Sequence, residues 1–327
     1  MNITFFHFEG WEKTLLNKNL ASHKLRFVSE PLTKKNASKA KDAEVVSVFV
    51  SSKIDKAILD ELPKLKLITT RSTGFDHIDL EECKKREITV SYVPGYGDNT
   101  VAEFTFGLIL NLTRKIYWAV AQLKKTGMFE FMGLRGIDLK GRTIGVVGTG
   151  RIGKEVIKIA RGFDMNIIAF DVIKDEEYAK KMNYTYVPLE TLLKQSDVVT
   201  LHCPLNTYTT HLINEKNLKC MKPTAYLINA ARGGIVDTKA LVDALKKKRI
   251  AGAALDVLEE EEELRKRDKK ESKTEHLDRV LIRMDNVLVT PHDAFNSEEA
   301  HERILQITIE NIQGFIKGKP TNVVPEV

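Results

Sequence analysis

Two short segments of the chain carry side chains suited to acid–base and anion chemistry. His292 follows the apolar run 287–289, and Arg232 follows the apolar run 226–229. Histidine titrates closest to neutral pH, so it suits donation of a proton to an oxygen anion that forms during a reduction. Arginine keeps its charge and grips a carboxylate through two parallel hydrogen bonds. These residue types favour the reduction of a carbonyl that stands beside a carboxylate.

The histidine needs a carboxylate partner before it can be separated from an ordinary structural histidine. A glutamate hydrogen-bonded to the imidazole would fix one tautomer and favour its charged form. The run 259–263 supplies five consecutive glutamates shortly after Asp256. The pattern does not choose among the five.

A glycine-rich segment predicts a dinucleotide site. Gly148-Thr149-Gly150-Arg151-Ile152-Gly153 follows the apolar run 143–147 and opens an amphipathic helical pattern. Glycines at this spacing allow a tight turn and a close approach of the backbone to a pyrophosphate at a helix N-terminus. The next apolar run, 166–170, ends in Asp171, whose carboxylate can accept hydrogen bonds from ribose hydroxyls and repels a 2′-phosphate. NAD is therefore favoured over NADP.

Short apolar runs alternate with longer amphipathic stretches along most of the chain. This alternation predicts parallel, doubly wound α/β sheets, and it occurs once before about residue 100 and again from about 140 to 290. The expected helices are 101–115, 152–163, 239–248 and 297–317, with Asp237 and Thr238 capping the third. The expected strands are 44–50, 67–70, 143–147, 166–170, 198–202, 225–229, 251–255 and 287–290.

The helices 101–115 and 297–317 lie where the two blocks meet, and we interpret them as crossovers. Residues 1–100 plus 297–327 then form one Rossmann-like domain with a flavodoxin-like sheet, and residues 101–296 form the dinucleotide-binding domain. Ligands are expected in a cleft between the two domains. The charged stretch 259–273 is expected to be a solvated loop or helix.

Composition excludes several other classes of protein. The chain has 327 residues, 43% of them hydrophobic, and its 51 basic residues are scattered among 45 acidic ones, so nucleic-acid binding is not indicated. No segment has the pattern of an export signal or a membrane span. The three cysteines are widely spaced and form no metal-ligand pattern, which favours a reducing cytoplasm and no metal.

Two weaker constellations favour structural interpretations. His202 and Cys203 are adjacent, and adjacent residues on a strand point to opposite faces, so a catalytic dyad is disfavoured against a cofactor-contacting loop. His77 and Asp79 fit a turn after Gly74 better than a metal site.

Over essentially its full length, the chain resembles the D-isomer-specific 2-hydroxyacid dehydrogenase family. The matching motifs are Arg71-Ser72-Thr73-Gly74-Phe75-Asp76-His77-Ile78-Asp79, Asn99-Thr100-Val101-Ala102-Glu103-Phe104, the glycine motif with Asp171, His202-Cys203-Pro204-Leu205, Ala231-Arg232-Gly233, Asp256-Val257 and Thr290-Pro291-His292. The resemblance implies NAD-dependent hydride transfer between a small 2-keto acid, pyruvate first, and a D-2-hydroxy acid. It also implies a homodimer built through the cofactor domain.

The resemblance assigns roles to individual residues. It implies a catalytic set of Arg232, Glu261 and His292, because the family's glutamate lies five residues beyond the aspartate matched by Asp256. Substrate contacts would come from Arg232, from the backbone N–H groups of Thr73 and Gly74, and from Tyr96. Cofactor contacts would come from Thr100, Gly148, Gly150, Arg151, Ile152, Gly153, Asp171, Cys203, Pro204, Thr209, Ala230 and Asp256.

The insertion between Glu261 and the strand at 287 is similar to the D-lactate dehydrogenase branch of the family. Two departures, Asp293 beside the histidine and Phe295 where a tyrosine is common, leave the substrate open. The alternatives are a glyoxylate or hydroxypyruvate reductase and, from another class, an NAD-sensing corepressor-like scaffold.

Overall fold

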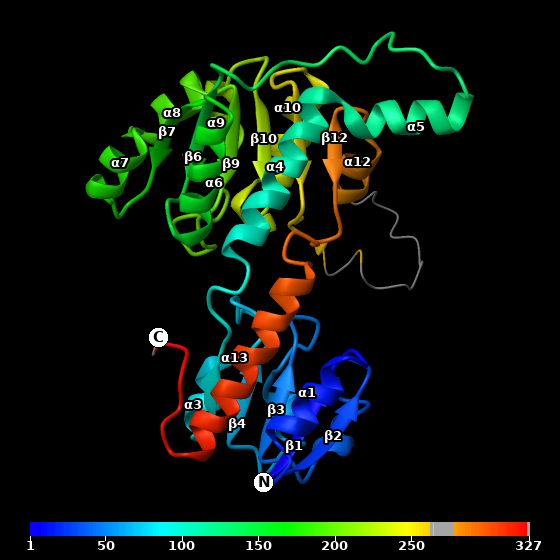
Figure 1. Ribbon diagram of the computed structural model, residues 1–327, viewed down its shortest axis with the longest axis vertical. Coiled ribbons are helices and arrows are strands. Elements are labelled where there is room, and N and C mark those ends of the chain that lie inside the picture. The colour runs from blue at the N-terminus through cyan, green and yellow to red at the C-terminus, as the bar shows by residue number, and fades with distance from the viewer. Residues whose placement is uncertain (262–263, 265–276, 326–327) are drawn as a thin grey trace. The chain divides into compact units, whose positions relative to one another are not determined.

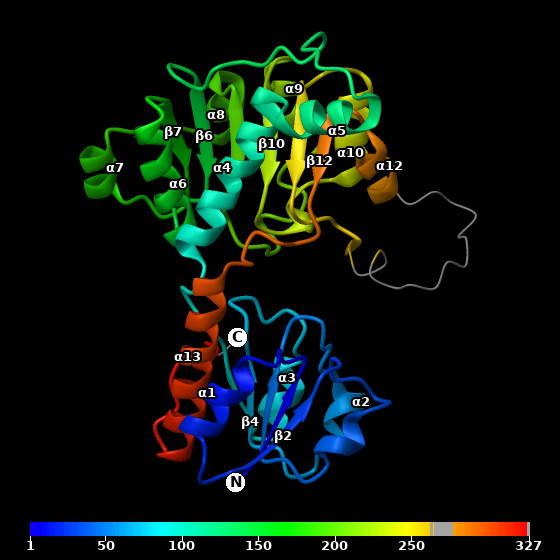
Figure 2. The ribbon, with the colours of Figure 1, turned by 45° about the vertical axis from the view of Figure 1, so that its right-hand side comes forward.

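The computed structural model describes residues 1–261, 264 and 277–325 of the chain. It divides into two compact units. Met1–Tyr96 with Ser297–Val327 make up one, here called the terminal unit, and Gly97–Asn296 make up the central unit. Each unit is built around one parallel sheet, as Figures 1 and 2 show.

The terminal unit has a five-stranded sheet with the order β2-β1-β3-β4-β5. Its central strands form because short apolar runs can be buried on both faces, as a parallel sheet requires. The strands are β1 (Asn2–Phe6), β2 (Lys24–Val28), β3 (Val45–Val48), β4 (Leu67–Thr70) and β5 (Thr89–Ser91).

Helices cover both faces of the terminal sheet (Figure 1). On one face, α1 (Glu12–Asn19) and the long α13 (Glu298–Ile316) bury Leu16, Ile309 and their neighbours against β1, β3 and β4. The other face carries a short 3-10 helix (Ala37–Ala40), α2 (Lys56–Leu59) and α3 (Leu80–Lys85). The return of the chain through α13 makes both ends of the sequence part of one unit.

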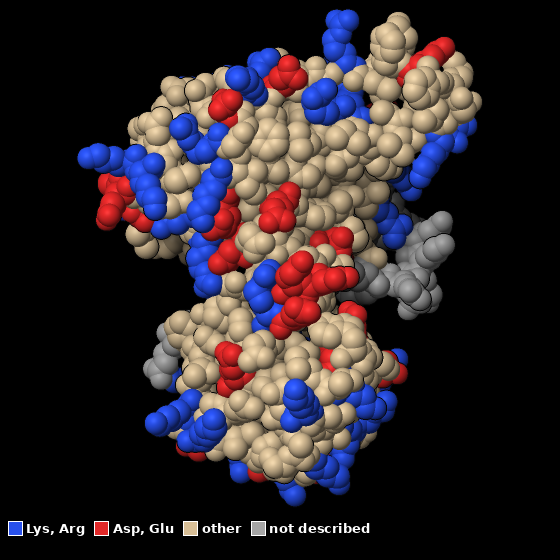
Figure 3. Space-filling view, viewed as in Figure 1, with Lys and Arg blue, Asp and Glu red and all other residues tan. Residues whose placement is uncertain are grey.

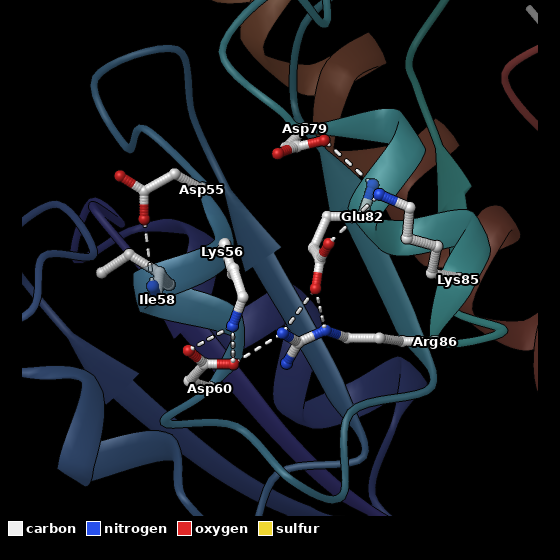
Figure 4. A network of polar contacts seen from close by, with 8 residues as sticks. All are labelled: Asp55, Lys56, Ile58, Asp60, Asp79, Glu82, Lys85 and Arg86. Atoms are coloured by element: carbon white, nitrogen blue, oxygen red, sulfur yellow. Dashed lines mark hydrogen bonds and ion pairs between the residues drawn. The ribbon is translucent and has the colours of Figure 1, made fainter.

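A network of surface charges joins α2 to α3 (Figure 4). Asp55 and Asp79 cap the two helices, each accepting from a backbone N–H inside the first turn. Arg86 then donates to Asp60, next to α2, and to Glu82, on α3, at 2.6 Å each. These pairs are partly exposed, so each contributes little to stability by itself.

The central unit has a seven-stranded sheet with the order β12-β11-β10-β9-β6-β7-β8. Since all its strand pairs are parallel, the carboxyl ends of the strands share one edge. The strands are β6 (Thr143–Val147), β7 (Asn166–Phe170), β8 (Thr185–Tyr186), β9 (Val198–Leu201), β10 (Tyr226–Asn229), β11 (Gly252–Leu255) and β12 (Val287–Val289).

Two layers of helices enclose this sheet. One layer holds α4 (Asp98–Arg114) and α6 (Arg151–Gly162), and the other holds α8 (Leu189–Gln195), α9 (Glu215–Cys220), α10 (Thr238–Lys246) and α12 (Leu277–Arg283). Alternate residues of one strand feed the two layers: Leu227 packs with the second and Ile228 with the first. Two further helices of the described residues are α5 (Ile116–Thr126) and α7 (Glu176–Met182).

The sequence predicted most of these elements. The strands expected at 67–70, 143–147 and 166–170 have the bounds given, and the other five expected strands differ by a few residues at their ends. The sequence analysis did not assign β1, β2, β5 or β8. Three of these are short or polar strands at or near a sheet edge, where one-sided pairing leaves a weak apolar pattern.

On the one face that Figure 3 draws, the charged side chains of the described residues do not gather into a single stripe. On the face drawn in Figure 3, Lys and Arg are interspersed with Asp and Glu over both units. None of the helices in the described residues is long and apolar enough to cross a membrane. Most of the charged stretch 259–273, which was expected to be a solvated loop or helix, lies outside the described residues.

Candidate active site

The glycine motif forms the turn from β6 into α6. Gly148 has a φ of +93°, and a β-carbon there would lie 2.7 Å from backbone atoms of His202 and Cys203. A β-carbon on Gly153 would lie 2.1 Å from the carbonyl oxygen of Gly148. Both positions therefore require glycine, and the turn leaves the N-terminus of the twelve-residue α6 beginning at Arg151. This geometry fits a pyrophosphate.

Asp171 lies directly after β7 and is held by the glycine turn. Its Oδ2 accepts from the backbone N–H of Thr149 at 2.6 Å and from the Thr149 hydroxyl at 3.1 Å, and its Oδ1 accepts from the N–H of Ile173 at 3.0 Å. The Thr149 hydroxyl also lies 2.8 Å from the Tyr186 hydroxyl. The carboxylate is thus fixed beside the helix N-terminus, where a dinucleotide ribose would lie.

The other motif residues near this turn have structural partners as well. Arg151 donates from Nε to Asp98 at 2.8 Å, and Ile152 packs against the core of the first helical layer. Thr100 is buried in the first turn of α4.

The segment after β9 runs beside the glycine turn. Burial lowers the pKa of His202 to about 3 and raises the pKa of the Cys203 thiol to about 11. At neutral pH both groups are therefore uncharged, which disfavours a nucleophilic dyad. The Thr209 hydroxyl donates to the Pro204 carbonyl at 2.6 Å and closes the loop that follows.

Arg232 lies in the turn after β10, beyond Ala230. The Asn229 side chain donates to the Arg232 carbonyl at 2.9 Å, and Arg232 Nη1 donates to the Ala231 carbonyl at 2.8 Å. A 3-10 helix (Gly233–Ile235) follows, and then Asp237 caps α10 by accepting from the N–H of Ala240. The predicted cap at Asp237 is confirmed.

His292 lies just beyond β12 in a left-handed conformation, with φ of +58°. Its Nδ1 is 2.9 Å from Oε1 of Glu261, so this glutamate lies within hydrogen-bond distance of the imidazole. Glu262 and Glu263 of the same run lie outside the described residues. The side chains of His292 and Glu261 are 26% and 28% exposed, which leaves both open to small molecules. The structure thus shows the pair that the family resemblance implied and that the pattern did not choose.

Asp256 organises the turn that carries His292. It is 1% exposed, and its carboxylate accepts from the Thr290 hydroxyl at 2.5 Å and from the N–H groups of Asp293 and Ala294 at 2.8 and 2.9 Å. Its carbonyl accepts from the N–H of His292 at 2.8 Å. Sequence analysis missed this positioning role because the carboxylate's partners lie far along the chain. A cofactor contact from Asp256 remains a prediction.

Three of the residues expected to contact the substrate, Thr73, Gly74 and Tyr96, belong to the terminal unit. The Thr73 hydroxyl donates to the Val93 carbonyl at 2.9 Å, and the Gly74 carbonyl accepts from the Ser72 hydroxyl at 2.6 Å. The Tyr96 carbonyl accepts from Arg303 Nε at 2.6 Å. Thus the central unit holds Arg232, Glu261, His292 and the cofactor set, and the terminal unit holds Thr73, Gly74 and Tyr96.

The weaker constellations also have structural partners. His77 Nε2 lies 3.1 Å from the Thr70 hydroxyl, and Asp79 caps α3. Within the described part of the chain, no three His, Cys, Asp or Glu side chains form a group that could hold a metal ion.

The chain is similar to known proteins over most of its length. Residues 106–294 match the family described as "D-isomer specific 2-hydroxyacid dehydrogenase, NAD binding domain". A glyoxylate reductase of Thermofilum pendens is 42% identical over 85% of this chain and 80% of its own length. The 2-hydroxyacid dehydrogenase homolog 1 of Schizosaccharomyces pombe is 40% identical over 96% of both chains.

Solved structures show the same fold over nearly the whole chain. A D-lactate dehydrogenase from Aquifex aeolicus, complexed with NAD and lactic acid, has a TM-score of 0.87 at 37% identity and covers 97% of this chain and 96% of its own. The apo D-lactate dehydrogenase from Escherichia coli has a TM-score of 0.87 at 33% identity and covers 99% and 100%. The chain therefore belongs to the D-isomer-specific 2-hydroxyacid dehydrogenase family, as an NAD-dependent oxidoreductase that acts on CH–OH donors.

Proposed function

We propose that this enzyme reduces a small 2-keto acid, pyruvate first among them, to the D-2-hydroxy acid. The observation that carries the proposal is the pair formed by His292 and Glu261 at the carboxyl end of β12. In this pair Nδ1 faces the glutamate, so Nε2 is the atom suited to exchange a proton with substrate.

The proposed roles follow from charge and donor type. NAD, when bound, supplies and accepts the hydride. His292 in its charged form donates a proton to the oxygen that becomes the hydroxyl, and in the opposite direction the neutral imidazole takes it back. Glu261 favours the charged imidazole. Arg232 holds the substrate carboxylate and polarises the carbonyl, with Thr73 and Gly74 N–H groups as further donors and Tyr96 facing the substrate.

The proposed cofactor contacts lie along the carboxyl edge of the central sheet. The glycine turn would hold the pyrophosphate, and Asp171 would accept from ribose hydroxyls. The full proposed set is Thr100, Gly148, Gly150, Arg151, Ile152, Gly153, Asp171, Cys203, Pro204, Thr209, Ala230 and Asp256.

The names of similar proteins support two candidate substrates. Pyruvate is favoured by the structural similarity to D-lactate dehydrogenases over nearly the full chain. Glyoxylate is the second candidate, because proteins named glyoxylate reductase from Thermofilum pendens and Thermococcus litoralis are 42% and 40% identical to this chain. Hydroxypyruvate, which is similar in size to pyruvate, is a third candidate substrate.

Steady-state oxidation of NADH with glyoxylate, pyruvate, hydroxypyruvate and larger 2-keto acids tests the choice. We expect the highest kcat/KM with pyruvate, and a higher value with glyoxylate would favour the second candidate. Tight NADH binding without turnover of any 2-keto acid would indicate an NAD-sensing scaffold instead. The His292→Gln variant is the control that assigns any turnover to this site.

We also propose that the enzyme is a homodimer formed through the central unit. Helix α5 exposes Ile116, Tyr117, Val120 and Leu123 to 42–55% each, and the following segment exposes Phe129 to 95%. In Figure 3 much of the surface near α4 and α5 is tan, with charged side chains among and around it. Contiguous apolar surface of this kind usually marks an interface, and a second copy of the chain would bury it.

Light scattering on the wild type and on the double variant Val120→Asp/Leu123→Asp tests the dimer. We expect a dimer that the double variant turns into a monomer, whereas the exposed Ile282→Asp control stays dimeric. A monomeric wild type would overturn this part of the proposal.

Cys83, Cys203 and Cys220 are free thiols, which supports a reducing compartment such as the cytoplasm.

A further inference from the structure

A second histidine–glutamate pair is formed by His211 and Glu259. Its glutamate lies two residues before Glu261 on the same segment. His211 Nε2 is 2.5 Å from Oε1 of Glu259, and Oε2 of Glu259 accepts from the backbone N–H of Thr238 at 3.2 Å. Both carboxylate oxygens of Glu259 therefore have donors. Glu259 is occupied and does not compete with Glu261 for His292.

The segment around Glu259 is also fixed through its backbone. A β-carbon on Gly233 would lie 2.0 Å from the Leu258 carbonyl oxygen, so residues 258 and 259 pack directly on the turn after Arg232. The N–H of Glu260 donates to Asp278 on α12 at 3.0 Å. The segment that precedes Glu261 is thus attached on more than one side.

His211 is held against the same turn. Its backbone N–H donates to the Gly234 carbonyl at 2.9 Å, and the backbone N–H of Ile213 donates to the Ile235 carbonyl at 3.0 Å. These backbone bonds tie the segment 211–213 to the turn after Arg232, and the bond between the imidazole and Glu259 ties the segment to the glutamate run.

We propose that His211 and Glu259 are positioning residues that set the register of the glutamate run, so that Glu261 is the carboxylate presented to His292. The proposal rests on the proposed role of Glu261 and His292. Neighbouring side chains of this segment leave the backbone in different directions, so a shift of one residue would withdraw Glu261 from the imidazole. A displacement of about 1 Å in such a pair is enough to slow the reaction by 10-fold or more.

The main test compares three variants by NADH oxidation with pyruvate across pH, together with the dissociation constant of NADH. Glu259→Ala removes the acceptor, Glu260→Ala removes one charge from the adjacent position as a matched control, and Glu261→Gln removes the carboxylate next to His292. We expect Glu259→Ala to lower kcat by about 10-fold and to move the pH at which reduction declines in the same direction as Glu261→Gln. Glu260→Ala should behave like the wild type.

A double-variant cycle shows whether Glu259 acts through Glu261. When Glu261 is already Gln, adding Glu259→Ala should cost less than about 2-fold in kcat, because the carboxylate to be positioned is absent. Losses that multiply, or a Glu259→Ala variant that matches the Glu260→Ala control, would overturn the positioning role. If Glu261→Gln itself leaves the rate and its pH profile unchanged, the proposed function of that pair fails, and the positioning role fails with it.

Variants of His211 provide an independent arm if Glu259→Ala unfolds. Gln places an N–H donor where histidine has Nε2, whereas Ala has none. We expect His211→Gln to keep kcat within about 3-fold of the wild type and His211→Ala to lower it by about 10-fold, with both proteins showing cooperative thermal unfolding. Equal rates in the Gln and Ala variants would contradict the proposal.

Discussion

The two histidine–glutamate pairs use the same chemical groups in different surroundings. Both histidines have left-handed backbones, with φ of +58° at His292 and +50° at His211, and their glutamates are two residues apart. Glu259 also receives the N–H of Thr238 at the start of α10, whereas His292 follows a strand at the carboxyl edge of the sheet. With the roles proposed above, placement by the backbone, rather than the residue pair itself, separates the histidine that would react from the one that would hold its neighbour in position.

Electrostatics agree with a structural ion pair at His211. The hydrogen bond that His211 donates to Glu259 raises the pKa of His211 above its usual value. Burial acts to raise the pKa of Glu259, but hydrogen bonds from His211 and Thr238 outweigh it and keep that pKa below its usual value. The pair therefore carries opposite charges up to a higher pH than isolated groups would.

The largest difference between the two pairs is expected in turnover. His292→Gln should lower kcat by about 100-fold or more, since general acid–base catalysis contributes on that scale, and should leave NADH binding nearly unchanged. His211→Gln should stay within about 3-fold of the wild type. Steady-state kinetics with pyruvate and fluorescence titration of NADH measure both effects. Near-normal turnover in His292→Gln would remove the distinction between the pairs.

The hydrogen-bond donors of a third carboxylate, that of Asp171, do not titrate near neutral pH. Asp171 accepts from the N–H and hydroxyl of Thr149 and from the N–H of Ile173, so it stays in place whatever the pH near neutrality. We expect the wild type to prefer NADH over NADPH by at least about 100-fold in kcat/KM, because the carboxylate repels a 2′-phosphate. Lys174 is a nearby cation that could offset this repulsion.

The Asp171→Ala variant tests that preference directly. It should weaken the use of NADH and narrow the gap to NADPH together, since one side chain supplies both the attraction and the exclusion. Equal kcat/KM for the two cofactors in the wild type would show that Lys174 controls the pocket instead.

Arg232 lies in the turn on which the segment 258–259 packs. A substitution that changes only its side chain should separate the proposed binding of substrate by the guanidinium from this backbone packing. Arg232→Lys keeps the charge and loses the planar fork, so we expect kcat/KM for the keto acid to fall by about 10-fold or more with little change in NADH binding. An unchanged KM and kcat would make the arginine structural. Arg161→Lys, exposed on α6, is the control.

The smallest expected effect concerns stability and pH. Because the folded-state pKa of His211 is raised, its pair stabilises the fold fully below the unfolded pKa and loses that contribution as pH rises through the folded pKa. The wild type should therefore have a higher free energy of unfolding than His211→Gln, and this difference should be larger at about pH 6 than at about pH 9. The change in the difference between the two pH values should be less than about 1 kcal/mol, because the pair is partly exposed. Urea denaturation at the two pH values measures the difference. The opposite sign would contradict the ion pair.

Local patterns predicted much of the fold and the motifs of the site. The strands β4, β6 and β7 and the cap at Asp237 follow from signals within a few residues, namely apolar runs and a capping side chain. The edge strands β2 and β8 have no such signal, since β2 contains Lys24 and Arg26 and β8 has two residues. Their pairing comes from neighbouring strands rather than from their own sequence.

The polar connections of the site depend on contacts between distant segments. No local pattern could show that Asp256 holds the turn at Thr290, or that Glu259 and Glu261 serve different histidines. Those pairings depend on the order of β10, β11 and β12 in the sheet, which brings the ends of the strands together. The family resemblance selected Glu261, but it gave no role to its neighbour Glu259.

The configuration of the lactate that the enzyme forms is the sharpest test of the proposed reduction of pyruvate to D-lactate. The purified enzyme would be incubated with pyruvate and NADH, and the lactate formed would be resolved by chiral chromatography, with His292→Gln as the control. We expect D-lactate in large excess from the wild type and a rate lower by about 100-fold from the variant. L-lactate as the main product, or no lactate from a folded enzyme that binds NADH, would contradict it.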